Sequence, residues 1–315
     1  EKSGYLVKIL DMSALRLPVN LLPTIIRKEK PDIVGITAMT PTINSAVTVA
    51  KKVKESDCNI TIILGGPHVT VLAEETLKNT PQDDIIVRGE GELTILELVK
   101  ALERNPNNVN RVLGVTYREG TKIKSNPSRP PILNLDKLPF PAFHLLPIGK
   151  YRLHPPFGRR SPVMPIITSR GCPYRCIFCS KSVFGEKYRS NSPVYVVDEI
   201  QLLNEKFGIK EIRFYDDVFT LDRKRVITIC KLLKEQRIDI LWSCETRVNL
   251  VDKELLKVMK DAGCYMIAYG VESGNQRILE NLRKDIKLEQ VVKAIELACE
   301  AGIETVTYFM IGSPG

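Results

Sequence analysis

The feature that most constrains the fold is a regular alternation of short apolar runs with amphipathic stretches. It fills two long blocks of the chain, and the first block covers residues 5–105. The strands predicted in this block are Tyr5–Leu10, Ile33–Thr37, Thr61–Leu64 and Ile85–Val87. Between them, Ile43–Glu55 and three shorter stretches carry apolar residues at helical spacing. This alternation predicts an α/β domain over residues 1–105, with a parallel, doubly wound, Rossmann-like sheet.

The second block begins at Val163 and repeats the alternation with a longer period. Its predicted strands are Val163–Thr168, Glu211–Tyr215, Asp239–Cys244, Tyr265–Val271 and Glu304–Ile311. Strand–helix units that follow one another without a break favour a parallel (β/α) barrel. We therefore expect residues 163–315 to form a partial barrel with five strands.

Residues 106–162 separate the two blocks and differ from both in composition. A small hairpin is predicted at Val112–Arg118 and Lys122–Lys124. Prolines then rule out a long regular element; they are Pro127, Pro130, Pro131, Pro139, Pro141, Pro147, Pro155 and Pro156. The segment is too rich in Leu, Ile and Phe to be disordered. We expect a packed linker that lies across the interface of the two domains.

Three cysteines follow the first predicted barrel strand, and their spacing suits a metal cluster. Cys172, Cys176 and Cys179 have three and then two residues between them. Three thiolates on one loop can hold three irons of a four-iron cube, which leaves the fourth iron open to an exogenous ligand.

Four other interpretations of these cysteines compete with the cluster. A structural zinc site needs four ligands, and no second pair lies nearby. A ferredoxin-like carrier needs a fourth cysteine in the same run. Disulfides are typical of secreted proteins, and this sequence shows no signal peptide and few cysteines. Burial of the three thiols in a core strand is disfavoured, because Pro173 marks the segment as a loop. The spacing favours the cluster.

Composition argues against several classes of function. The formal net charge is +9, but Lys and Arg are interspersed with Asp and Glu and form no basic block. Nucleic acid is therefore not an expected partner. No apolar run approaches the roughly 20 residues that span a bilayer, so no membrane span is expected. With no signal peptide and few cysteines, the expected location is the cytoplasm.

The run Cys172–Cys179, with Phe178 directly before the last cysteine, resembles the signature of the radical S-adenosylmethionine (SAM) superfamily. The resemblance implies a [4Fe-4S] cluster on Cys172, Cys176 and Cys179, whose open iron binds SAM. One electron then cleaves SAM to a 5′-deoxyadenosyl radical. A reductant such as flavodoxin or ferredoxin would supply that electron. The family barrel has six strand–helix units, so the last unit and the family's opening strand are expected to be cut from this chain.

Loops after the strands of the first block resemble the cobalamin-binding domain found in one large radical SAM subfamily. Ligands bind at the carboxyl ends of such strands. There the chain has Thr37–Thr42, Gly65-Gly66-Pro67-His68 and Arg88-Gly89-Glu90-Gly91-Glu92. The resemblance implies a cobalamin site, between this edge and the barrel mouth, lined by Thr40, Gly65, Gly66, His68, Gly89 and Glu90. The motif Asp-x-His-x-x-Gly is missing, so cobalamin is expected to bind without a protein lower ligand. His68 is expected to line the cofactor rather than ligate cobalt.

The resemblance also implies a SAM site at the ends of the barrel strands. The residues assigned to it are Phe178, Asp216, Asp217, Glu245, Arg247, Glu272, Ser273 and Ile311. Asp216 would accept a hydrogen bond from the SAM ammonium group, and Glu272 and Ser273 would bind the ribose. Phe178 and Ile311 would lie against the adenine. Arg247 could pair either with the SAM carboxylate or with Glu245.

Taken together, the sequence predicts a cobalamin-dependent radical SAM enzyme. The expected reaction abstracts hydrogen from an unactivated carbon of a small molecule and transfers a methyl group to it. Isoprenoid, tetrapyrrole and lipid-like substrates are the candidates. The first alternative is an oxidative cyclase of the anaerobic Mg-protoporphyrin ester cyclase type, and the second is a non-catalytic iron–sulfur or zinc-binding module. Methylthiotransferases are disfavoured, because their N-terminal domain has three more cluster cysteines and this one has only Cys58.

Overall fold

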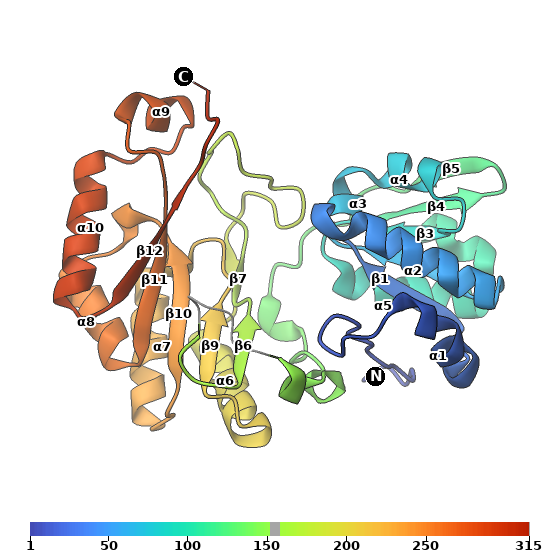
Figure 1. Ribbon diagram of the computed structural model, residues 1–315, viewed down its shortest axis with the longest axis horizontal. Coiled ribbons are helices and arrows are strands. Elements are labelled where there is room, and N and C mark those ends of the chain that lie inside the picture. Colours follow the sequence, from blue (N-terminus) through green and yellow to red (C-terminus); the bar gives the residue numbers. More distant parts are fainter. Residues whose placement is uncertain (152–157, 315) are drawn as a thin grey trace. The chain divides into compact units, whose positions relative to one another are not determined.

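The structure is a computed structural model that describes residues 1–151 and 158–314, with the side chains of residues 106 and 107 left out. The chain divides into two compact units, and each is described by itself (Figure 1). The N-terminal unit consists of residues 16–132 and 180–185. The barrel unit consists of the remaining described residues.

A five-stranded sheet organises the N-terminal unit. Its strands are β1 (Ile33–Thr37), β2 (Thr61–Gly65), β3 (Ile85–Val87), β4 (Val115–Glu119) and β5 (Lys122–Ser125), in the order β1-β2-β3-β4-β5. The first three strands are parallel, as predicted. The predicted strand at Tyr5–Leu10 is wrong, because these residues pair with no strand and Leu6, Val7, Ile9 and Leu10 are exposed. An apolar run becomes a strand only where a neighbouring strand can accept its hydrogen bonds.

Helices cover both faces of this sheet. They are α1 (Leu22–Glu29), α2 (Ile43–Ser56), α3 (Pro67–Val71), α4 (Ala73–Asn79) and α5 (Gly91–Arg104). Side chains alternate between the two faces of a strand, yet Ile62, Ile63 and Leu64 of β2 are all buried. Ile63 packs with Leu98 of α5 in one core cluster. The unit is therefore a doubly wound α/β domain, which confirms the predicted fold class.

The hairpin predicted at Val112–Lys124 forms, but it belongs to the sheet. Strand β4 runs antiparallel to β3, with Val115 opposite Val87, and β5 completes the edge. The Asn126 side chain donates hydrogen bonds of 2.8 Å to the carbonyl oxygens of Val109 and Val112 and fixes the end of the hairpin. The sheet thus extends past residue 105, while the domain limits 1–105, 106–162 and 163–315 stay predictions.

The barrel unit contains all five predicted parallel strands. They are β6 (Val163–Ile166), β9 (Glu211–Phe214), β10 (Leu241–Thr246), β11 (Cys264–Glu272) and β12 (Glu304–Phe309), in the order β12-β11-β10-β9-β6. The helices of this unit are α6 (Pro193–Phe207), α7 (Arg223–Glu235), α8 (Lys253–Asp261), α9 (Gln276–Asn281) and α10 (Leu288–Glu300). Figure 1 shows the strands side by side with helices along one face of the sheet.

Aromatic side chains fill the core between the barrel sheet and its helices. The rings of Phe214 and Trp242 meet edge to face, with 5.5 Å between their centroids. Phe219 packs against both rings. The indole nitrogen of Trp242 donates a 2.8 Å hydrogen bond to the carbonyl oxygen of Ala262. This core ties β9 and β10 to the turn that follows α8, and it gives the strand ends a rigid base.

A two-stranded ribbon that the sequence analysis missed brackets the cysteine loop. Strand β7 (Ser169–Arg170) pairs antiparallel with β8 (Arg189–Ser190). The pairing joins the two ends of the loop that carries Cys172, Cys176 and Cys179. Two-residue strands leave no periodic signal in a sequence, so this ribbon could not be read from the pattern.

The described part of the proline-rich segment consists of short 3₁₀ turns. They are η4 (Leu135–Lys137), η5 (Phe143–Leu145) and η6 (Ile148–Lys150). Phe143 and Ile148 are buried in the core of the barrel unit. Pro155 and Pro156 lie outside the described residues.

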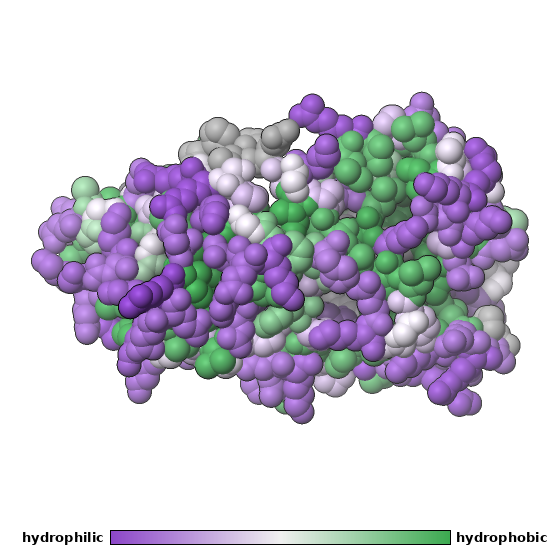
Figure 2. Space-filling view, turned by 90° about the horizontal axis from the view of Figure 1, so that it is seen from below, coloured by the Kyte–Doolittle hydropathy of each residue, from purple (hydrophilic) through white to green (hydrophobic). Residues whose placement is uncertain are grey.

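Over residues 1–151 and 158–314, every helix is too short or too polar to cross a membrane. Hydrophilic side chains also dominate the face of the barrel unit that is seen at the left of Figure 2.

Candidate functional site

Asp216 joins the ends of two neighbouring strands just before the cysteine loop. It directly follows Tyr215, whose backbone nitrogen donates to the carbonyl oxygen of Ile166 at the end of β6. Its carboxylate accepts hydrogen bonds from the backbone nitrogen of Thr168 at 2.6 Å, the hydroxyl of Thr168 at 2.7 Å and the hydroxyl of Ser169 at 2.7 Å. Only 2% of Asp216 is exposed. Burial raises the pKa of Asp216, and the nearby Arg225 guanidinium opposes that shift.

These contacts give Asp216 a positioning role. Both of its carboxylate oxygens already accept hydrogen bonds from the chain. Its assignment as acceptor for the SAM ammonium group stays a prediction.

Asp217 anchors the first residue of the cysteine loop. Its carboxylate accepts a 3.0 Å hydrogen bond from the backbone nitrogen of Gly171, which directly precedes Cys172. Burial raises the pKa of Asp217, and the hydrogen bond from Gly171 opposes the shift. Two adjacent carboxylates after β9 thus fix the strand end and the start of the loop.

The cysteine loop is held on its other side by the segment after α9. The backbone nitrogen of Ile177 donates a 3.1 Å hydrogen bond to the carbonyl oxygen of Leu282. Cys176 is buried, whereas Cys172 is half-buried and Cys179 is exposed. The pKa of Cys176 is lowered to about 6, mainly by a hydrogen bond from the thiol of Cys179, with smaller contributions from Lys284 and Arg247.

Three thiolates on one loop fit an iron–sulfur cluster. Among the described residues, no group of three or more His, Cys, Asp or Glu side chains lies close enough together to hold one metal ion. In a four-iron cube each thiolate binds a different iron, so the three sulfurs need not converge on one point. Lys284 and Arg247 favour a thiolate at Cys176. The pKa of Cys172 is raised by burial, and that of Cys179 by its hydrogen bond with Cys176. The assignment of Cys172, Cys176 and Cys179 as ligands stays a prediction that this arrangement supports.

Arg247 lies in direct contact with the cysteine loop. Its Nη1 is 3.5 Å from Sγ of Cys176, and its guanidinium lies 3.7 Å from the centroid of the Tyr174 ring. The alternative pairing of Arg247 with Glu245 does not form. Glu245 instead accepts hydrogen bonds from Arg213 at 3.0 Å and from the hydroxyl of Tyr308 at 3.3 Å. A role for Arg247 toward the SAM carboxylate stays a prediction.

Glu272 and Lys284 form a buried ion pair next to the loop. The Nζ atom of Lys284 is 2.8 Å from Oε1 of Glu272, and both side chains are buried. Glu272 has a φ of 71° and lies at an irregularity in the pairing of β11 with β12. Both predicted ribose ligands therefore already have partners within the chain. Glu272 pairs with Lys284, and the hydroxyl of Ser273 accepts a 3.1 Å hydrogen bond from the backbone nitrogen of Asn275.

Lys284 was not predicted as a site residue from the sequence. Its neighbours Arg283 and Asp285 have positive φ values of 51° and 52°. The surrounding turn therefore has no periodicity that could have revealed which side chain points inward.

Phe178 and Ile311, both assigned to adenine, differ in their surroundings. The Phe178 ring lies 5.6 Å from Nζ of Lys284, so it belongs to the group that surrounds the cysteine loop. Ile311 is fully exposed and packs against none of these residues.

In the N-terminal unit, the loops after β1 and β2 are tied together at the carboxyl edge of the sheet. Nδ1 of His68 lies 3.2 Å from the hydroxyl of Thr40. Gly66 has a φ of 105°, and a Cβ atom there would lie 2.7 Å from the carbonyl oxygen of Ala38. Only glycine permits this close approach of the two loops.

The loop after β3 lies at the same edge. The backbone nitrogen of Gly89 donates a 3.1 Å hydrogen bond to the hydroxyl of Thr70 in α3. Glu90 is buried, and its Oε2 accepts a 3.4 Å hydrogen bond from the backbone nitrogen of Ile132. A Cβ atom added at Gly65 or at Gly89 would meet nothing within 4 Å. Open space above these glycines suits a large, flat ligand, so the edge fits the predicted cofactor.

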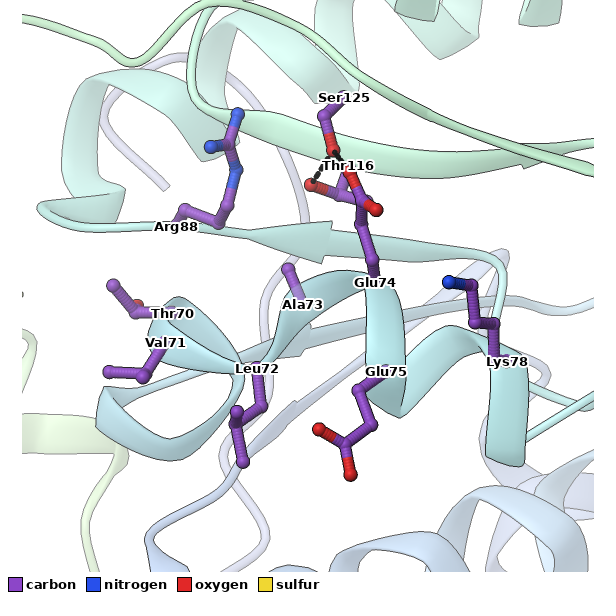
Figure 3. A pocket seen from close by; sticks show the side chains of 10 residues that line it. All are labelled: Thr70, Val71, Leu72, Ala73, Glu74, Glu75, Lys78, Arg88, Thr116 and Ser125. Carbon is purple, nitrogen blue, oxygen red and sulfur yellow. Dashed lines mark hydrogen bonds between the residues drawn. The ribbon is translucent and has the colours of Figure 1, made fainter.

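A polar pocket of about 450 Å³ lies beside this edge (Figure 3). Thr70 and Arg88 lie at one end of it and Lys78 at the other. The Arg88 side chain donates hydrogen bonds to the carbonyl oxygens of Val115, at 3.3 Å, and of Asn126. The pocket therefore connects the loop after β3 with the hairpin that the sequence analysis had placed in the linker.

Together, the fold and the site define a class of protein. An α/β domain with an open glycine-rich edge precedes a parallel barrel that carries a three-cysteine loop.

Comparison with known proteins agrees with this class. Residues 166–315 match the family model described as the radical SAM superfamily, and residues 1–99 match the model of the B12 binding domain. The chain belongs to the radical SAM superfamily and carries a B12-binding domain before its radical SAM domain, which confirms the predicted family.

Two curated relatives and one solved structure extend the comparison. The chain is 42% identical over 310 residues to an uncharacterized methyltransferase of Pyrococcus horikoshii, covering 98% of this chain and 66% of the relative. It is 36% identical over 288 residues to the anaerobic magnesium-protoporphyrin IX monomethyl ester cyclase of Rubrivivax gelatinosus, covering 90% of this chain and 51% of the cyclase.

The fold resembles that of the cobalamin-dependent S-adenosylmethionine radical enzyme OxsB with aqua-cobalamin bound. The TM-score is 0.81 at 22% identity, over 96% of this chain and 44% of OxsB. The chain thus spans only part of the length of each of these proteins.

Proposed function

We propose that the protein is a cobalamin-dependent radical SAM methyltransferase that acts on a small molecule. One observation carries the proposal: a single chain holds both a three-cysteine loop fixed by Asp217 and Arg247 and an open glycine-rich edge in a B12-binding domain. The methyltransferase of Pyrococcus horikoshii, which matches nearly the whole chain, supports methyl transfer.

Different residues are proposed to bind each of the two cofactors. Cys172, Cys176 and Cys179 would hold the cluster, and Asp217 keeps the loop in place through Gly171. When bound, the cluster with SAM supplies a radical and cobalamin supplies a methyl group.

In the N-terminal unit, Gly65 and Gly89 leave room for the corrin, and Thr40, Gly66 and Glu90 shape the edge beside them. Nδ1 of His68 lies within hydrogen-bond distance of the Thr40 hydroxyl. The missing Asp-x-His-x-x-Gly motif supports cobalamin binding without a protein lower ligand.

The substrate and the electron donor follow from chemistry and charge. Isoprenoids, tetrapyrroles and lipid-like molecules are the proposed substrates, because they offer unactivated carbons. A flavodoxin or ferredoxin is the proposed electron donor. The net charge of +9 favours such a donor if its surface is acidic.

Oxidative ring closure is the second candidate, and the identity of 36% to the cyclase favours it. The fate of the SAM methyl group separates the two reactions. Protein reconstituted with cobalamin under reducing conditions is incubated with SAM that carries a labelled methyl group. A methyltransferase moves the label to the bound corrinoid, whereas the absence of label there would favour the cyclase.

The central experiment concerns the cluster. The chain is reconstituted with iron and sulfide without oxygen, and iron content and 5′-deoxyadenosine formation from SAM are measured. We expect about four irons per chain, with both signals lost in Cys176→Ala. Cys58→Ala is the matched control, because Cys58 is an exposed cysteine outside the loop. Retention of both signals in Cys176→Ala would refute the proposal.

A further inference from the structure

Arg247 is a buried cation that lacks a carboxylate partner. Only 4% of the residue is exposed. Within the described residues, its hydrogen bonds go to Oδ1 of Asn249 at 3.3 Å, to the carbonyl oxygen of Lys284 and to Sγ of Cys176. Its guanidinium also stacks on the ring of Tyr174. An isolated charge is costly to bury, so an anion is expected close by.

The cysteine loop is the group that can supply this anion. Sγ of Cys176 lies 3.5 Å from Nη1 of Arg247. Lys284 is another buried cation near the loop, and Glu272 neutralises it at 2.8 Å. Arg247 contributes a positive charge at Sγ of Cys176 that no carboxylate of the described residues compensates.

We infer that Arg247 is a positioning residue that sets the reduction potential of the cluster held by Cys172, Cys176 and Cys179. The inference rests on the proposed function, because it requires that cluster. Reduction by one electron adds one negative charge at the cluster, and a fixed cation stabilises the reduced form more than the oxidised form. Hydrogen bonds to the ligand sulfurs act in the same direction.

The reduction potential is measured without SAM, so that any contact of Arg247 with the SAM carboxylate cannot contribute. Wild type and variants are reconstituted anaerobically, and their iron and sulfide contents are determined. A titration with dithionite and redox mediators, followed by electron paramagnetic resonance, then gives the midpoint potential. Dithionite supplies the electron, which stays on the cluster.

Three variants test the inference. Arg247→Gln removes the charge and keeps a hydrogen-bond donor. We expect its equilibrium constant for reduction to fall at least tenfold, which is 59 mV for a one-electron couple. Arg247→Lys keeps the charge, and we expect less than a threefold change. Lys231→Gln removes one exposed positive charge from α7, and we expect the wild-type potential.

Three results would overturn the inference that Arg247 sets the reduction potential. The inference is wrong if Arg247→Gln and Lys231→Gln have the same potential, even if Arg247→Gln binds SAM more weakly. If Arg247→Gln takes up no iron, Arg247→Lys decides, and a tenfold or larger change in that variant would overturn the inference. If wild type itself assembles no four-iron cluster, the proposed function fails, and the inference fails with it.

Discussion

Gly66 illustrates at the scale of one residue how the N-terminal unit brings its loops together. Its φ of 105° disfavours other residues, and a Cβ atom would approach the carbonyl oxygen of Ala38 to 2.7 Å. We expect Gly66→Ala to lower the free energy of unfolding by about 1–3 kcal/mol and to weaken cobalamin binding. Urea unfolding and corrinoid absorbance measure the two effects. The control is Gly35→Ala in β1, whose Cβ meets nothing within 4 Å and which lies outside the proposed cobalamin site; equal losses in both variants would contradict the explanation.

Glu199 of α6 gives a prediction for the pH dependence of stability. Burial, followed by the charge of Asp216, raises the pKa of Glu199 to about 7, from an ordinary value of 4.5. The folded state therefore binds this proton more tightly than the unfolded state. The stability that the protonated group contributes is complete below 4.5 and is lost as the pH rises through about 7.

This loss amounts to about 3 kcal/mol for a shift of this size. We expect wild type to be less stable at about pH 8 than at about pH 5, and Glu199→Gln to have a flatter profile. Urea unfolding at both pH values tests this, and parallel profiles for the two proteins would count against it.

Individual site residues were predictable to different degrees. The cysteines and the glycine-rich loops could be proposed as site residues because their spacing is local in the sequence. Lys284 and the contact of Arg247 with Cys176 were not, since both depend on which distant segments the sheet brings together. The carboxylate of Asp216 was assigned to SAM from its place after a strand, and only the fold shows its bonds to Thr168 and Ser169.

At the scale of elements, the junction of β6 and β9 depends on Asp216 and Arg225. Arg225 donates hydrogen bonds to the carbonyl oxygen of Thr168 at 3.0 Å and to its hydroxyl at 2.7 Å, and its Nη1 lies 3.9 Å from Asp216. We expect Asp216→Ala to cost about 3–5 kcal/mol, because a buried guanidinium loses its anion. Asp216→Asn keeps one acceptor oxygen and should cost less. Thermal unfolding ranks the variants, and equal melting temperatures for wild type and Asp216→Ala would contradict this role.

Secondary structure was most predictable where an element is long or buried on both faces. The five barrel strands and the first three sheet strands have strong apolar signals, and all of them form. Tyr5–Leu10 has an equally apolar signal but no neighbouring strand. Strands β7 and β8 exist only as partners of each other. The pairing of β4 with β3 joins a segment predicted for the linker to the predicted first domain.

At the scale of the whole molecule, the residues proposed for each cofactor belong to a single unit. The cobalamin loops lie in the N-terminal unit, which has a core of its own around Ile63 and Leu98. The three cysteines lie in the barrel unit. We expect an iron chelator in air to remove the iron and leave the corrinoid absorbance in place. Gly66→Ala should weaken corrinoid binding and leave the iron content unchanged. Loss of corrinoid in proportion to iron would contradict the assignment of the two cofactors to separate units.

The buried pair of Glu272 and Lys284 has a consequence for how this sequence can vary. A Cβ atom at Gly270 would lie 2.7 Å from Oε1 of Glu272 and 2.8 Å from Nζ of Lys284. The glycine thus makes room for the ion pair, and each charge compensates the other. Loss of one charge leaves the other buried and unpaired, so a single step away from this arrangement is costly. Positions 270, 272 and 284 are therefore energetically coupled: both charges have to be replaced together before a larger side chain fits at position 270.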